Sequence, residues 1–128
     1  MHRSTLTITA ALCLAAFLPE HARASPEHDA LLYLDAQVLP RKAVACSARI
    51  PGYSARFEPA FRTWLSRNKA RVNSGEAFLR AEAERTKVPF EPDIQSVGAS
   101  MAQQWTALPM VTLQDNCEAL LLYLKEVE

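Results

Sequence analysis

The pattern of apolar residues is strongest between Tyr53 and Lys87, where it predicts one long amphipathic helix. If each residue turns the chain by about 100°, one face of this helix collects the large apolar side chains. These are Phe57, Phe61, Trp64, Leu65, Val72 and Leu79. Their spacing is typical of a helix that buries one side in a core. We therefore expect this stretch to be the central helix of the fold.

Two residues interrupt that apolar face, Asn68 and Gly75. A buried asparagine without hydrogen-bond partners costs about 1–3 kcal/mol. Asn68 is therefore either a satisfied core amide or a polar group that lines a pocket. Gly75 either permits the close approach of another backbone or ends the helix at its C-terminal cap. Because Leu79 extends the same face beyond Gly75, we favour a continuous helix.

Two shorter helical segments are expected before the long helix. Ser25 is a preferred N-cap residue and Pro26 fits the first helical turn, so a first helix starts there. Pro40 predicts that this helix ends or kinks near Leu39, because proline lacks the backbone N–H. A second short helical piece then covers residues 41–50.

Two more helices are expected after the prolines that follow Lys87. The first, capped by Asp93, runs over residues 94–108, and the second starts at Thr112. The sequence contains no alternating apolar and polar stretch of the kind that predicts a strand. It therefore predicts an all-α fold, a small irregular four-helix bundle around one long central helix.

The helix predicted over residues 94–108 carries no charged residue. Opposite its apolar stripe lie only small or uncharged polar residues. These are Gln95, Ser96, Ala99, Ser100, Gln103 and Thr106. A solvated helix face usually carries charges, so we expect this face to be covered. Either another helix of the chain or a partner protein covers it.

Residues 1–24 have the organisation of a cleaved signal peptide. A short basic start is followed by an apolar segment, residues 6–18, that is too short to span a bilayer. The Ala-Arg-Ala sequence at residues 22–24 predicts cleavage between Ala24 and Ser25. We therefore expect an exported protein, periplasmic or secreted. Its mature chain would be a single helical domain, residues 25–128, without a membrane span.

Export suggests a structural role for the cysteines. Cys13 lies in the signal segment, so the mature chain keeps Cys46 and Cys117. In an oxidising compartment such a pair predicts a disulfide bond. The sequence has neither a Cys-x-x-Cys motif nor the ligand set of a zinc site. We therefore expect no redox centre, no metal and no other cofactor.

Charge and motifs disfavour an enzyme or a nucleic-acid-binding protein. Without Arg3, Arg23 and Glu20 of the signal segment, 12 basic and 13 acidic residues remain, so no strong positive charge attracts nucleic acid. A Ser-His-Asp arrangement is not expected, because His28 is the one mature histidine. The glycine-rich motifs that bind nucleotides are also absent. The expected class is a non-catalytic binding protein.

The charges are divided unevenly, with a basic surplus over residues 41–87 and an acidic surplus over residues 88–128. Several cations flank the apolar face of the long helix. They either face solvent or acidic helices of the same chain, or form a docking ridge for an acidic protein partner. The cations considered for this role are Arg62, Arg67, Lys69, Arg71 and Arg80.

Asp35 lies near the middle of the apolar side of the first helix. It is either at the edge of a short helix or buried and paired, with Asn68 or Arg71 as the natural partners. Because isolated buried charges are strongly disfavoured, the second case would make Asp35 and Asn68 the buried polar residues of the core.

The chain resembles small exported, single-disulfide helical proteins of Gram-negative bacteria. The residues that carry the resemblance are Cys46, Pro51-Gly52-Tyr53, Phe61, Trp64, Asn68, Gly75-Glu76 and Cys117. In general type it is similar to periplasmic immunity proteins, which neutralise a toxin by capping it. The resemblance implies a stoichiometric protein partner and no catalysis. The alternatives are a periplasmic chaperone or envelope-stress protein that binds unfolded clients, and a small-molecule carrier with a pocket around Asn68 and Asp35.

Overall fold

The computed structural model describes residues 25–126, and these residues form five α-helices and no strand. The helices are α1 (Pro26–Arg49), α2 (Tyr53–Arg67), α3 (Lys69–Thr86), α4 (Phe90–Thr106) and α5 (Met110–Lys125). The predicted all-α class is confirmed, but the bundle has five helices in place of the expected four. The predicted signal segment, with Ala24 of its cleavage site, lies outside the described residues.

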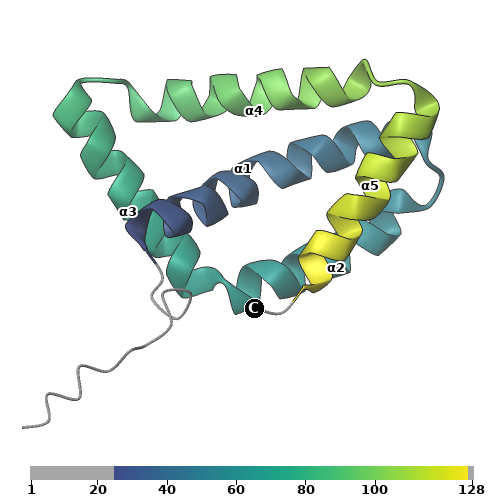
Figure 1. The fold of residues 1–128 in the computed structure, drawn as a ribbon, viewed down its shortest axis with the longest axis horizontal. Helices are drawn as coiled ribbons and strands as arrows, with labels where there is room; N and C mark the ends of the chain where they lie inside the picture. Colours follow the sequence, from purple (N-terminus) through teal and green to yellow (C-terminus); the bar gives the residue numbers. More distant parts are fainter. Residues whose placement is uncertain (1–24, 127–128) are drawn as a thin grey trace, which may run out of the picture.

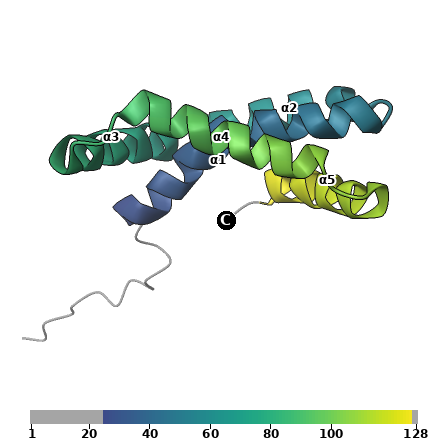
Figure 2. The ribbon, with the colours of Figure 1, turned by 90° about the horizontal axis from the view of Figure 1, so that it is seen from above.

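The central helix is α1, which has 24 residues. Figure 1 shows α1 crossing the middle of the molecule while the other helices frame it, and α1 contacts each of them. Seen from above, the arrangement is flattened (Figure 2). The prediction that residues 53–87 form the central helix is therefore wrong.

The helix α1 continues through Pro40, so the predicted end near Leu39 and the separate piece over residues 41–50 are wrong. The Ser25 Oγ caps its start by accepting a hydrogen bond from the His28 N–H at 3.1 Å. On either side of Pro40, Leu39 and Ala43 are buried in the core. Proline removes one backbone hydrogen bond, and the burial of these neighbours outweighs that loss.

The stretch expected as one long helix is bent at Asn68, which separates α2 from α3. The Asn68 backbone lies outside the α-helical region, with φ −102° and ψ 9°. Its side-chain Nδ2 donates to the Trp64 carbonyl at 2.9 Å, and the same carbonyl accepts the Asn68 backbone N–H at 3.0 Å. Asn68 therefore forms an elbow, and the prediction of a continuous helix through it is wrong.

Gly75 lies in the middle of α3, where that helix crosses α1. A Cβ atom at this position would lie 1.9 Å from the backbone oxygen of Asp29. The helix does not end at Gly75, which confirms the interpretation that this glycine permits a close backbone approach.

The predicted disulfide between Cys46 and Cys117 is confirmed, and it joins α1 to α5 with a Cα–Cα distance of 6.0 Å. Both cysteines are fully buried, as are Leu113, Leu124 and Tyr53. The Tyr53 hydroxyl donates to the Cys117 carbonyl at 2.9 Å, so α2 is held at the same point.

A row of aromatic rings continues from this point along α2. The ring centroids of Tyr53, Phe57, Phe61 and Trp64 follow one another at 6.2, 5.3 and 5.9 Å. Tyr123 of α5 lies 6.2 Å from Trp64 at the end of the row. The aromatic part of the predicted apolar face therefore packs as expected, and it binds α2 to α5.

Arginines of the basic half contact the acidic half of the chain. Arg56 of α2 pairs with Glu118 of α5 at 2.6 Å, and Arg49 donates to the Leu108 carbonyl after α4 at 2.7 Å. Arg41 hydrogen-bonds both the carbonyl and the side chain of Gln95. Much of the uneven charge is thus used between helices of the chain.

Candidate functional site

The uncharged face of α4 is open to solvent in the described chain. All of the residues expected to be covered there are exposed, namely Gln95, Ser96, Ala99, Ser100, Gln103 and Thr106. On the inner side, Ile94 is buried and Gly98 packs against the Arg41 side chain. The interpretation that another helix of the chain covers this face is therefore wrong for residues 25–126.

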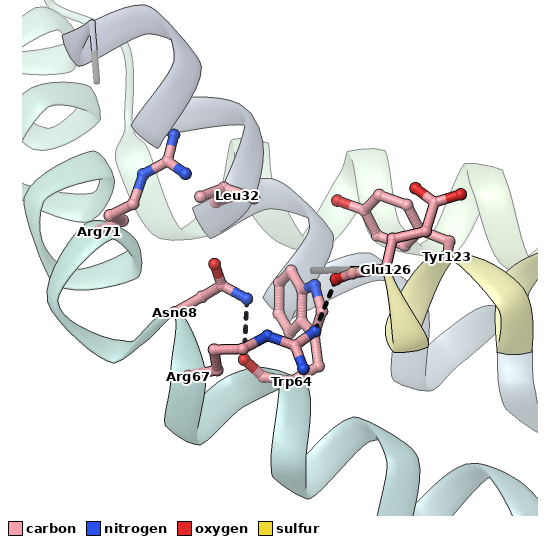
Figure 3. Close-up of a pocket in the computed structure, with 7 residues that line it drawn as sticks. All are labelled: Leu32, Trp64, Arg67, Asn68, Arg71, Tyr123 and Glu126. Carbon is pink, nitrogen blue, oxygen red and sulfur yellow. Dashed lines mark hydrogen bonds between the residues drawn. The ribbon is translucent and has the colours of Figure 1, made fainter. Parts of the chain in front are cut away.

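A pocket of about 230 Å³ lies where the elbow at Asn68 meets the end of α5 (Figure 3). The Arg67 guanidinium donates to the carbonyls of Leu124 and Glu126 at 3.0 and 2.9 Å. These acceptors belong to the C-terminal end of α5, where a cation also opposes the helix dipole. The remaining lining residues are Leu32, Trp64, Arg71 and Tyr123. We interpret this pocket as a structural junction that fixes the elbow to α5.

Arg71 is also engaged within the chain. Its Nε donates to Asp29 Oδ1 at 2.9 Å, and the Asp29 side chain is only 8% exposed. The buried carboxylate of α1 is therefore Asp29, one turn from the start of the helix. Asp35 and Asn68, expected as buried polar residues, are both half-buried, and neither is bonded to the other.

Arg80 connects α3 to α4. Its guanidinium pairs with Glu76 at 3.1 Å and with Glu91 at 2.6 Å, and it lies 4.2 Å from the centroid of the Phe90 ring. Of the five cations predicted to flank the apolar face, Arg67, Arg71 and Arg80 thus have partners inside the molecule.

The other two cations, Arg62 and Lys69, lie on the outer side of the elbow. Within residues 25–126 neither is paired with a carboxylate. They border a shallow surface hollow of about 430 Å³. We call it the elbow groove, and it is lined by Arg62, Leu65, Ser66, Lys69, Val72 and Asn73. Leu65 is 36% exposed although it belongs to the predicted core face.

A second hollow, of about 370 Å³, lies between α1, α4 and α5. We call it the Asp35 hollow, and its lining residues are Asp35, Leu39, Lys42, Trp105, Asn116, Ala119, Leu120 and Tyr123. The Tyr123 hydroxyl donates to Asp35 Oδ2 at 2.6 Å. Burial raises the pKa of Asp35, while the Tyr123 hydrogen bond and the nearby Lys42 charge act in the opposite direction.

Sequence reasoning identified Asp35 but not its neighbours in this hollow. Lys42 lies two turns further along α1, and its ammonium is 5.0 Å from the centroid of the Trp105 ring. Asn116 and Tyr123 are likewise two turns apart on α5. The spacing within each helix is visible in the sequence, but which faces meet depends on how α1 runs through Pro40.

No group of three or more histidine, cysteine, aspartate or glutamate side chains in the described chain could hold a metal ion. Over the same residues, no helix has both the length and the apolar character needed to cross a membrane.

Comparisons with protein-family models, with curated proteins and with solved structures give no match.

Proposed function

We propose that this protein is an exported, non-catalytic binding protein of the inhibitor or immunity type, which caps an acidic protein partner through the elbow groove. The observation that carries the proposal is that Arg62 and Lys69 are left without a carboxylate partner in the described chain. The neighbouring Arg67, Arg71 and Arg80 all have one or more acceptors within the molecule.

The chemistry of the groove specifies the partner. Leu65 and Val72 form an apolar floor, and Arg62 and Lys69 lie at its border. Protein interfaces bind most tightly where an apolar anchor fills a pocket and complementary charges surround it. The fitting occupant is an apolar side chain of a protein surface, flanked by aspartate or glutamate.

Contacts near the elbow also favour binding. The Arg67 side chain hydrogen-bonds carbonyls at the end of α5, and the Asn68 side chain hydrogen-bonds the Trp64 carbonyl of α2. Because these contacts order the C-terminal end of α2 before a partner binds, less conformational entropy is lost on binding.

Export is supported by the pattern of residues 1–24 and by the disulfide, which is typical of oxidising compartments. We expect mass spectrometry of the periplasmic fraction to detect a mature chain that starts at Ser25. Recovery of the full-length chain in the cytoplasm, with free thiols at Cys46 and Cys117, would contradict this part of the proposal.

The binding function is tested by isolating the stoichiometric complex from periplasm and reconstituting it from the two purified proteins. The double variant Arg62→Glu/Lys69→Glu should bind the purified partner at least about tenfold more weakly, because two attractive charges become repulsive. The salt dependence of association should also decrease. If the partner is an enzyme or toxin, its activity should fall to zero at one equivalent.

The matched control is Arg85→Glu/Lys87→Glu, which makes the same charge change at the other end of α3, where both residues are exposed. This control should bind as the wild type does. Equal loss in both variants would show a non-specific charge effect, and a protein recovered without any stoichiometric partner would refute the proposal. Binding to many unfolded proteins with similar affinity would support the chaperone class instead.

A further inference from the structure

The Asp35 hollow is built from one face of each of two helices. Asp35, Leu39 and Lys42 follow one another at the spacing that places residues on one side of α1. Asn116, Leu120 and Tyr123 do the same on α5. The end of α4 adds Trp105, so three helices, α1, α4 and α5, contribute side chains to one hollow.

Asp35 lines the hollow, and one of its carboxylate oxygens has no hydrogen-bond partner in the described chain. Its Oδ2 is occupied by the Tyr123 hydroxyl. No other hydrogen bond to Asp35 occurs in the described chain, and no fully buried side-chain oxygen there lacks a partner. The second oxygen is therefore accessible to solvent. A partly desolvated carboxylate oxygen of this kind is a strong acceptor for a ligand ammonium group.

Lys42 supplies the opposite charge. Its ammonium packs over the Trp105 ring, and within residues 25–126 it forms no ion pair with Asp35 or with another carboxylate. The two residues are seven positions apart, which corresponds to a rise of about 10 Å along the helix. A ligand head group with two opposite charges, together with a hydrogen bond of about 2.9 Å at each end, spans a length similar to this rise.

The rest of the lining is apolar, apart from the Asn116 amide and the Tyr123 hydroxyl. Leu39, Ala119 and Leu120, which we call the apolar floor, also line the hollow. The volume of about 370 Å³ is at the small end of the range typical of ligand sites.

We propose that the Asp35 hollow binds a small zwitterion with an apolar side chain, of the free α-amino acid class. Asp35 accepts hydrogen bonds from its ammonium group, Lys42 pairs with its carboxylate, and the apolar floor packs against its side chain. This site is separate from the elbow groove, so it does not depend on the proposed binding of a protein partner.

The test uses L-leucine as the probe and the purified protein. The sequence has two tryptophans, so a Trp64→Phe background leaves Trp105 as the reporter of the hollow. Leucine should change the Trp105 fluorescence in a saturable manner, and NMR should show shifts at Trp105 and Asn116. Asp35→Asn and Lys42→Gln should each weaken the affinity about tenfold or more, because each removes one charge-assisted contact.

Two leucine analogues separate the contributions of the two charges. Isoamylamine lacks the carboxylate and 4-methylpentanoate lacks the ammonium group, and both should bind at least about tenfold more weakly than leucine. Lys42→Gln should remove the difference between leucine and isoamylamine. If isoamylamine binds as well as leucine, or if leucine causes no saturable change up to its solubility limit, the proposal is wrong.

The elbow groove provides the matched control. Arg62→Glu/Lys69→Glu should leave leucine binding unchanged, because neither residue lines the Asp35 hollow. Thermal unfolding of each variant separates a loss of binding from a loss of folding. If leucine does not bind, the proposed binding of a protein partner is unaffected. If no protein partner is found, the proposed binding of leucine is likewise unaffected.

Discussion

Gly75 is the residue at which the packing of α3 on α1 leaves no space for a side chain. We predict that Gly75→Ala destabilises the protein by about 3 kcal/mol, because overpacking of this size requires backbone movement. The neighbouring atom is the Asp29 backbone oxygen, only 1.9 Å from the added Cβ, and it cannot move without α1. Urea denaturation measures the effect as a lower midpoint.

Gly98→Ala is the control for this prediction. A Cβ at Gly98 would lie 2.9 Å from Arg41, but the contact is with the end of a flexible side chain. Alanine is favoured over glycine in a helix by about 1 kcal/mol, so we expect little net change. If the two variants are equally stable, the close approach of α1 and α3 is not as described.

Tyr53 is expected to govern part of the response to alkaline pH. Burial and the Glu118 charge raise its pKa to about 12, whereas an unfolded tyrosine titrates near ~10. The native state therefore disfavours the tyrosinate. The contribution of Tyr53 to stability is complete below the pKa that it has in the unfolded chain. This contribution is lost as the pH rises through the pKa that Tyr53 has in the folded protein.

Tyr53→Phe tests this in two ways. The tyrosinate absorbance of the folded variant should lack the step near pH 12, and its stability should decline less between neutral and alkaline pH. At neutral pH the variant should be less stable by about 1 kcal/mol, because the hydrogen bond to Cys117 is lost. Ionisation of Tyr53 in the folded protein at the usual tyrosine pKa would contradict the prediction.

At the scale of the helices, a residue of α2 stabilises the C-terminal end of α5. Arg67→Met should destabilise the protein by about 1–3 kcal/mol, because it removes the charged donor to the Leu124 and Glu126 carbonyls. Hydrogen exchange should become faster in the last turn of α5 and remain unchanged in α4. Arg85→Met, which breaks an exposed pair with Glu82, should leave the stability nearly unchanged, because water screens exposed ion pairs.

The helix boundaries illustrate which features local sequence rules predict. The pattern over residues 53–87 predicts a continuous helix, with Gly75 as the alternative break, whereas the helices separate at Asn68. Gly75 stays helical because α1 packs against it. Pro40 stays helical because buried residues surround it. In both places contacts between distant segments outweigh the intrinsic preference of one residue.

The candidate sites likewise depend on contacts between segments that are distant in the sequence. The flanking cations could be named from the sequence, but which of them lack an internal partner depends on the elbow at Asn68. Asp35 was noted as unusual on an apolar face, whereas its hydrogen bond to Tyr123 joins residues 88 positions apart. A pairing at that distance in sequence leaves no local pattern.

For the whole molecule, the disulfide closes a loop between residues 71 positions apart. In the chain-entropy model a link of this length contributes about 4 kcal/mol, a large share of the stability of a small domain. Cys46→Ala/Cys117→Ala, or reduction of the wild type, should therefore lower the unfolding midpoint strongly. Equal midpoints for oxidised and reduced protein would contradict this prediction.

The central place of α1 also affects the order in which the protein can fold during synthesis. Among the described helices, α1 is made first, and each of the other four contacts it. Its Cys46 meets its partner only when α5 has appeared. Many contacts join segments that are far apart in the sequence. Such contacts form slowly compared with local helix formation. A chain from which α5 has not yet emerged would thus stay loosely structured.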